Sequence, residues 1–365
     1  MAAELLRLRA RGHHDVRATH GKTLEFTTDA EITARATCVL GVGTTAAPAH
    51  PVAGPVRIEI RCGALSTEFR ALAHSGWRPG GTAIVRRSAE RLPTTFATDA
   101  GLAASALPRD LVELLADPAA EIDVAVRRDT DAAPALIRYH AGPGADPRLT
   151  AELAAADEVI TADPIAEQAV RDHAPEHRAP APGRTLVVTG VDPTTPLPAD
   201  APEHVELLGV PTDLAVAAAA PTPAPVVLAG AVDRRTLPDL LRTHHAARIV
   251  LRTTAAELPK LLNQARRLLG TRTAVLAPTA PGRAERPRRT PVEDAEPGSG
   301  ALVCCLEPVA TATSTAEHPD ARWPALLESL LDQDVSPKTL AAALAAQPGW
   351  TRRLAYDAVL ALKKG

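Results

Sequence analysis

The sequence has few aromatic residues and few cysteines, and each shortage excludes a class of protein. Aromatic side chains make up 2% of the 365 residues, which argues against the stacking platforms that bind single-stranded nucleic acids. The four cysteines, Cys38, Cys62, Cys304 and Cys305, lack metal-binding spacing. This indicates a reduced, cytoplasmic protein without a disulfide framework.

Long apolar runs are also missing. No run approaches the roughly 20 residues that a membrane-spanning helix needs. Residues 1–11 are charged throughout, unlike the apolar centre of a signal peptide. We therefore expect no membrane partner.

Charge of one sign is not in excess. The formal net charge is −3, from 40 basic and 43 acidic side chains, so bulk electrostatics do not favour a polyanion partner. Apolar residues make up 45% of the chain, enough to bury a core. The length predicts two or three domains of ordinary size.

Residues 1–130 are predicted to form a strand-rich α+β domain. Ser105–Leu115 has the leucine spacing and the serine cap of a helix. Segments with β-branched or alternating residues predict strands at Thr23–Thr27, Thr37–Gly41, Val56–Cys62, Thr82–Arg86 and Glu121–Arg127.

Residues 135–310 alternate between predicted strands and helices, which is the pattern of an α/β domain. The first strand, Leu136–His140, ends in a Gly/Pro loop at 141–147. The strand Thr185–Thr189 ends at Gly190. Residues 323–365 are predicted to form a small all-helical domain of three short helices, one of them capped by Ser336 before Pro337.

A basic, proline-rich loop is predicted at 278–299. Long loops of this kind are either functional or disordered. Its arginines are candidates for binding RNA phosphates, the alternative being a solvated Arg/Pro loop; they are Arg283, Arg286, Arg288 and Arg289.

Three motifs of the middle domain resemble the tetrapyrrole methylases, in that family's order. Tyr139–Thr150 combines a strand, a Gly-Pro-Gly loop and a helix that opens with Leu-Thr. Thr185–Pro193 ends in Gly-Val-Asp-Pro, and His204–Asp213 is a strand before an Ala-rich helix. The resemblance implies an α/β methyltransferase that uses S-adenosyl-L-methionine.

The same resemblance implies the cofactor-binding residues. Glycine loops at the carboxyl ends of strands let the backbone approach a ligand closely. No catalytic base can be assigned, although His140 lies at the first loop. The implied residues are Gly142, Pro143, Gly144, Asp146, Gly190, Asp192, Thr212 and Ala215.

Two departures from the family pattern keep an alternative open. Val191 stands where the family has a second glycine, and residues 193–204 are too short and proline-rich for the helix that the family has there. The alternative is a degenerate methylase fold that serves as a non-catalytic scaffold or as an RNA- or nucleotide-binding protein.

The tail resembles the helical domain of the RsmI family of ribosomal RNA ribose methyltransferases. The matching segments are Leu326–Leu331, Val335–Leu344 and Arg352–Leu360. The resemblance implies RNA or a ribosomal subunit as partner, and tetrapyrrole-type methylases imply a homodimer. Two alternatives stay open. The tail could be a helical bundle that docks a partner or a second copy, and the enzyme could methylate a small molecule instead of RNA.

The N-terminal region resembles a mostly archaeal family of unknown function. The resemblance covers nearly all of residues 5–130 and rests on segment 9–26, Gly41–Gly43, Ile84–Ser88 and Thr98–Ser105. It implies no activity.

Segment 9–26 concentrates histidine and basic residues. His13 and His20 lack the spacing that would place them side by side on a helix or strand, and we predict no metal. The candidates for a phosphate-binding patch, with ordinary surface and core histidines as the alternative, are Arg11, His13, Arg17, His20 and Lys22.

Overall fold

The computed structural model divides into two compact units, Met1–Val309 and Ala310–Gly365. Each unit is described by itself. The residues that the structure describes are 4–48, 50–142, 144–194, 201–202, 204–279, 287–296, 298–308, 327, 330–331, 335–345 and 352–364.

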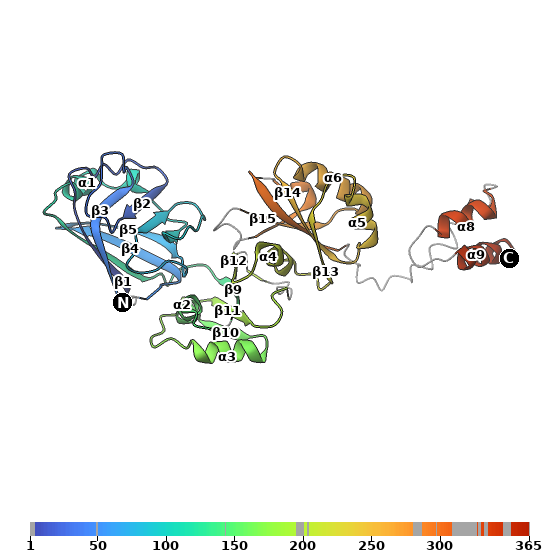
Figure 1. The fold of residues 1–365 in the computed structure, drawn as a ribbon, viewed down its shortest axis with the longest axis horizontal. Coiled ribbons are helices and arrows are strands. Elements are labelled where there is room, and N and C mark those ends of the chain that lie inside the picture. Colours follow the sequence, from blue (N-terminus) through green and yellow to red (C-terminus); the bar gives the residue numbers. More distant parts are fainter. Residues whose placement is uncertain are drawn as a thin grey trace. The chain divides into compact units, whose positions relative to one another are not determined.

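Eight strands near the N-terminus close into a barrel, drawn in blue and cyan in Figure 1, in the order β1-β3-β2-β6-β7-β5-β4-β8. Alternate residues of β4 fill the interior, namely Val56, Ile58 and Ile60. The strands are β1 Glu4–Arg11, β2 Thr23–Phe26, β3 Val39–Ala47, β4 Gly54–Cys62, β5 Leu65–Ala73, β6 Ala83–Arg86, β7 Thr95–Thr98 and β8 Glu121–Arg128.

The strand-rich prediction for this region is confirmed, but its α+β class needs correction. Among the described residues before 130, the only α-helix is α1, Arg109–Leu115, which follows the 3-10 turn Ala104–Ala106. Leu111 and Leu115 of α1 join the barrel core. The region is therefore mainly β, because the strands close on themselves instead of packing beneath several helices.

Four parallel strands follow, in the order β10-β11-β9-β12. Helices α2 and α3 pack on one face, where Leu149 meets Ile137 and Tyr139 of β9. The elements are β9 Ala135–His140, α2 Pro147–Ala155, β10 Glu158–Thr161, α3 Pro164–Asp172, β11 Arg184–Thr189, β12 His204–Leu208 and α4 Thr212–Ala218. The predicted strand–helix alternation of this segment is confirmed.

A second sheet has the order β13-β14-β17-β15-β16. Its β13 and β14 are parallel, and its other pairs are antiparallel. Cys304 and Cys305 of β17 are unpaired and belong to different cores of this sheet. The elements are β13 Val226–Ala231, α5 Leu237–Thr243, β14 Arg248–Thr254, α6 Leu258–Leu269, β15 Thr273–Pro278, β16 Arg288–Pro291, a 3-10 turn Val292–Asp294 and β17 Ala301–Leu306.

Helix α4 connects the cores of the two sheets. Its alanines pack with Leu136 and Leu207 of the parallel sheet and with Val250 and Val303 of the second sheet. Small side chains allow the helix backbone to lie close to both sheets. The Ala-rich helix expected after the strand that begins at His204 is thus confirmed, and it is buried.

The C-terminal unit contains two described helices, α8 Pro337–Ala345 and α9 Arg352–Lys364. The Ser336 hydroxyl accepts a hydrogen bond from the Thr339 backbone N–H at 3.1 Å, which confirms the predicted cap. The first of the three predicted helices lies largely outside the described residues. No helix in the described part of the chain has the length and apolar character needed to cross a bilayer.

Candidate functional site

Three strands of the parallel sheet end side by side at its carboxyl edge. His140 of β9 is in register with Thr189 of β11, and Tyr139 is in register with Leu208 of β12. The backbone N–H of Ala141 donates to the Thr189 carbonyl at 2.8 Å, so the first two loops leave the sheet together.

The connections after β9 and β12 leave toward opposite faces of the sheet. After β9 the chain enters α2, which packs on the face that carries Ile137 and Tyr139. After β12 it enters α4, which packs on the face that carries Leu136. Because adjacent strands with opposite connections leave a crevice at their carboxyl ends, this edge is the expected ligand position in an open parallel sheet.

The glycine loop after β9 lines a hollow of about 830 Å³ between α2 and α3. Gly142 and Gly144 both face open space, because a side chain added at either would have no atom within 4 Å. Gly144 has a φ of +92°, a conformation that favours glycine. Pro143 lies outside the described residues.

Asp146 also lines this hollow, but both of its carboxylate oxygens have structural partners. One oxygen accepts from the backbone N–H groups of Arg148 and Leu149 at 3.1 and 3.2 Å, and so caps α2. The other accepts from the Tyr139 hydroxyl at 2.5 Å. Burial and this carboxylate raise the pKa of Tyr139 well above its usual range. Asp146 therefore holds the loop against the strand that precedes it.

His173 is a residue of the hollow that the sequence did not indicate. Its Nε2 accepts from the Asp146 backbone N–H at 2.8 Å, and its Nδ1 lies 2.8 Å from the Ala169 carbonyl. Since Nε2 accepts, Nδ1 carries the proton and donates. The ring thus joins the end of α3 to the start of α2.

The loop after β11 is packed against α3. A side chain at Gly190 would lie 2.5 Å from the Ile165 side chain, so the glycine makes room for that isoleucine. The Asp163 carboxylate accepts from the Gly190 and Val191 N–H groups at 2.7 and 3.1 Å. These bonds, the one from Gly190 first, lower the pKa of Asp163. Val191 is 64% exposed and does not fill the space between the loops.

The remaining cofactor candidates lie away from the hollow between α2 and α3. Asp192 accepts from the backbone N–H and the hydroxyl of Thr194, both at 2.7 Å. Thr212 begins α4, and Ala215 is buried in the core between the two sheets. Neither these three residues nor Gly190 lines that hollow.

His140 is half-buried at the centre of the carboxyl edge. Its Nδ1 lies 3.2 Å from the Thr189 hydroxyl oxygen. Gly209, at the end of β12, has a φ of +72° and lies so close to the His140 carbonyl that any side chain there would clash. The backbones of the three loops therefore meet around His140.

The N-terminal histidines hold their own loops in place. His13 is 5% exposed, and its Nδ1 accepts from the Asp15 N–H at 3.1 Å. Its Nε2 therefore carries the proton and donates to Glu31 at 3.1 Å. His13, His14 and Asp15 lie close enough together to hold a metal ion, but both ring nitrogens of His13 already have partners.

The five phosphate candidates have different local surroundings. His20 Nδ1 accepts from the Thr23 N–H at 3.1 Å, and Arg17 donates to the His14 carbonyl at 2.8 Å. Arg11 lines a separate shallow hollow on the barrel that also carries Glu121. Lys22 is exposed in a bend before β2.

The predicted basic loop is partly a strand, which corrects the interpretation of 278–299 as loop throughout. Arg288 and Arg289 lie in β16, paired with β15. Arg289 Nε forms an ion pair with Glu307 at 3.2 Å, and Arg288 donates to the Glu296 carbonyl at 2.7 Å. Arg283 and Arg286 lie outside the described residues.

Comparison with known families identifies only the N-terminal region. Residues 8–129 match the model of a family described as "Domain of unknown function (DUF371)". The match covers about a third of the chain and confirms the resemblance expected for this region. No curated protein matches the chain.

Proposed function

We propose that residues 135–308 are a methyltransferase domain that binds S-adenosyl-L-methionine at the carboxyl edge of its parallel sheet. The observation that carries this proposal is the meeting of the loops after β9, β11 and β12 around His140. Crevices of this kind are where open parallel sheets bind nucleotide-like ligands. The choice of S-adenosyl-L-methionine as the ligand comes from the resemblance to tetrapyrrole methylases.

Methyl transfer is a reaction that suits the carboxyl edge of a parallel sheet. Methyl transfer from a sulfonium ion is an in-line displacement, so most of the rate comes from aligning and desolvating the two reacting atoms. Gly142 and Gly144 leave the backbone of the first loop open to a ligand. His140 lies where the loops meet, and we assign it the role of candidate proton acceptor.

We propose RNA as the methyl acceptor, with a ribose hydroxyl as the reacting group. The support is the resemblance of the tail to the RsmI family, which also implies a ribosomal subunit as partner. The resemblance of the middle domain to tetrapyrrole methylases implies a homodimer as the active form. A small-molecule acceptor is the alternative. Transfer of tritium from labelled S-adenosyl-L-methionine to ribosomal RNA, with a matched reaction lacking RNA, separates the two.

The first experiment is a calorimetric titration of the full chain with S-adenosyl-L-methionine. We expect saturable binding that Gly142→Leu weakens by about tenfold or more, since a leucine would occupy the open edge and a tenfold change corresponds to about 1.4 kcal/mol. Gly81→Leu is the matched control, because a Cβ added at Gly81 in the N-terminal region would meet the Arg78 carbonyl only at an ordinary contact distance of 3.5 Å. Wild-type protein that gives no heat and no thermal shift would overturn the proposal.

A non-catalytic scaffold is the second candidate, and two contacts favour it. Ile165 occupies the space beside Gly190, and both oxygens of Asp146 are already engaged. A scaffold of this kind predicts no binding of S-adenosyl-L-methionine by either the wild-type chain or the Gly142 variant.

A further inference from the structure

The two helical layers of residues 135–308 have opposite charge. Residues 146–178, which contain α2, β10 and α3, have eight acidic and three basic residues. Residues 232–270, which contain α5, β14 and α6, have eight basic and three acidic residues. The whole chain has 40 basic and 43 acidic residues, so the layer of α5 and α6 departs from the balance of the molecule.

Helices α5 and α6 cover one face of the second sheet (Figure 1). Their apolar side chains share a core with Ile249 and Leu251 of β14. The apolar stripe of α6 repeats at positions 258, 261, 262 and 265, which leaves the other sides of the helix to polar residues. Of the eight basic residues in 232–270, all except the buried Arg248 are exposed.

Four of these cations belong to one side of α6, and we call them the basic row: Arg234, Arg235, Lys260 and Arg267. Gln264 donates to the Arg234 carbonyl at 3.0 Å, so the turn before α5 lies against the middle of α6. Lys260 and Arg267 stand four residues before and three residues after Gln264, which places all three on the same side of the helix. Two helical turns separate Lys260 from Arg267, about 10 Å along the axis.

Two carboxylates lie beside the basic row. Glu257 is shared by Arg234 at 3.9 Å and Lys260 at 2.7 Å. Asp233 accepts from two backbone N–H groups of its own turn, both at 2.9 Å, and also faces the charge of Arg235. Four cations therefore stand against two carboxylates.

The unbalanced charge is at the arginines. In the part of the chain that the structure describes, the side chains of Arg235 and Arg267 form no hydrogen bond or ion pair. Arg267 stands in the last turn of α6, where a cation complements the helix dipole. Lys260 stands in the first turn, where the dipole disfavours a cation. The stability of α6 thus explains Arg267 but not the row.

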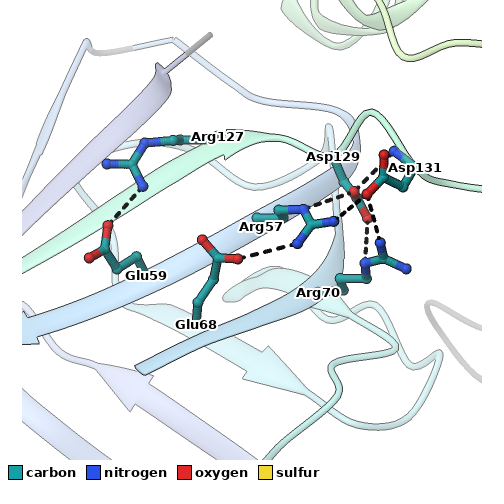
Figure 2. Close-up of polar contacts among 7 residues, drawn as sticks. All are labelled: Arg57, Glu59, Glu68, Arg70, Arg127, Asp129 and Asp131. Atoms are coloured by element: carbon teal, nitrogen blue, oxygen red, sulfur yellow. Dashed lines mark hydrogen bonds and ion pairs between the residues drawn. The ribbon is translucent and has the colours of Figure 1, made fainter. Parts of the chain in front are cut away.

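Arginines on the outside of the barrel differ from the basic row, because they face carboxylates. Figure 2 shows Arg57 and Arg70, from neighbouring strands, pointing toward Asp129 and Asp131. Arg57 lies 2.6 Å from Asp131, and Arg70 meets both carboxylates at 3.2 Å. These four charges neutralise one another, so this part of the barrel has no net attraction for a polyanion.

From the excess of exposed cations, we propose that the outer surface of α5 and α6 binds the phosphate backbone of double-stranded RNA. Each phosphate that meets a cation of the row releases condensed counterions, which supplies affinity for a polyanion of any sequence. Residues 232–270 contain no Phe, Tyr or Trp, so the surface lacks the platforms on which unpaired bases stack. The choice of RNA rests on the proposed methyl acceptor, whereas the position of the surface rests on the charges alone.

The test is the affinity of the full chain for an RNA duplex of about 20 base pairs, measured by fluorescence anisotropy between about 50 and 200 mM salt without S-adenosyl-L-methionine. We expect binding that weakens steeply as salt rises. The double variant Arg235→Gln/Arg267→Gln should bind more weakly at every salt concentration. Its slope of log K against log salt should be smaller by about two, since each lost phosphate contact removes about one.

Lys260→Gln is a second variant, at the opposite end of α6 from Arg267. Its slope should be smaller by about one. Since the helix dipole does not favour this cation, a weaker affinity here cannot come from a destabilised helix end.

Arg109→Gln/Arg171→Gln is the matched control, because it removes two exposed helical arginines from α1 and α3 and changes the net charge equally. It should leave affinity and slope unchanged. Equal loss in this control, or an unchanged slope in the row variant, would overturn the proposal. A wild type that binds S-adenosyl-L-methionine but no RNA duplex would overturn this inference and leave the cofactor site standing.

Discussion

A buried ion pair is one of the contacts that join the barrel to the parallel sheet. Glu206 and Arg91 are both almost fully buried, 2.8 Å apart. Glu206→Ala would leave the Arg91 guanidinium buried without its carboxylate, so we expect the free energy of unfolding to fall by roughly 3–5 kcal/mol. Urea unfolding followed by circular dichroism measures this loss.

The control for this prediction is Glu68→Ala. Glu68 also pairs with an arginine, Arg57 at 3.3 Å, but its side chain is 44% exposed. Exposed pairs contribute about 0–1 kcal/mol. If Glu206→Ala cost no more than Glu68→Ala, Glu206 would not be a structural ion at the junction.

The histidines show that the role of a single side chain is hard to predict from the sequence. The sequence marks His13 and His20 as candidates because they stand among basic residues. In the structure each ring accepts a backbone N–H from its own loop, Asp15 for His13 and Thr23 for His20. Such bonds depend on the path of the loop, which residue spacing does not specify. His204 gave no signal, since its partner Glu206 is fixed by Arg91, which is far away in the sequence.

At the scale of elements, Asp163 joins α3 to the loop after β11. Its carboxylate caps α3 through the Ala166 N–H at 2.9 Å and accepts from Gly190 and Val191. We expect Asp163→Ala to lower the free energy of unfolding by about 1–2 kcal/mol at pH 7, as for other helix caps. Asp239→Ala, an exposed acid in the first turn of α5, should cost much less.

The effect of Asp163 depends on pH in a defined direction. Since the Gly190 N–H and the other bonds lower its pKa below the ordinary value of 3.8, the carboxylate stabilises the native state fully above about pH 5. The stabilisation is lost as the pH falls through the lowered pKa. The difference between wild type and Asp163→Ala should therefore shrink below pH 4, and a difference constant from pH 7 to pH 3 would contradict the assignment.

Local patterns predicted most elements of the α/β segment, because strands there are short apolar runs and helices carry caps.

Four strands of the described chain were not predicted, three in the barrel and one in the second sheet. In β1 leucines alternate with arginines, so its charge hid the inward-facing leucines. Strands β5 and β7 close the barrel, and β16 is held by its pairing with β15. Pairing across the sheet, which no local window contains, stabilises these strands.

At the scale of the whole molecule, the two compact units have separate cores. The core that contains Leu340, Leu344 and Val359 draws only on residues after 326. We therefore expect a chain ending at Val309 to unfold at the same temperature as the first unit of the full chain. Differential scanning calorimetry of both chains measures this. A midpoint lower by several degrees would show that the first unit needs the C-terminal unit.

The same truncated chain bears on the proposed acceptor. If the tail recruits RNA, the shorter chain should bind S-adenosyl-L-methionine as the full chain does but transfer less methyl to RNA. Equal transfer by both chains would remove the tail from acceptor recognition.

The sequence by itself determined the strand–helix alternation of the middle segment, the cap at Ser336 and the similarity of residues 8–129 to a family of unknown function. These depend on local periodicity, local hydrogen bonds or extended similarity. Only the tertiary structure decided that the N-terminal strands close into a barrel, that Gly190 accommodates Ile165, and that His204, Glu206 and Arg91 meet. The physical reason is that strand closure, packing and buried charge pairs join residues that lie far apart along the chain.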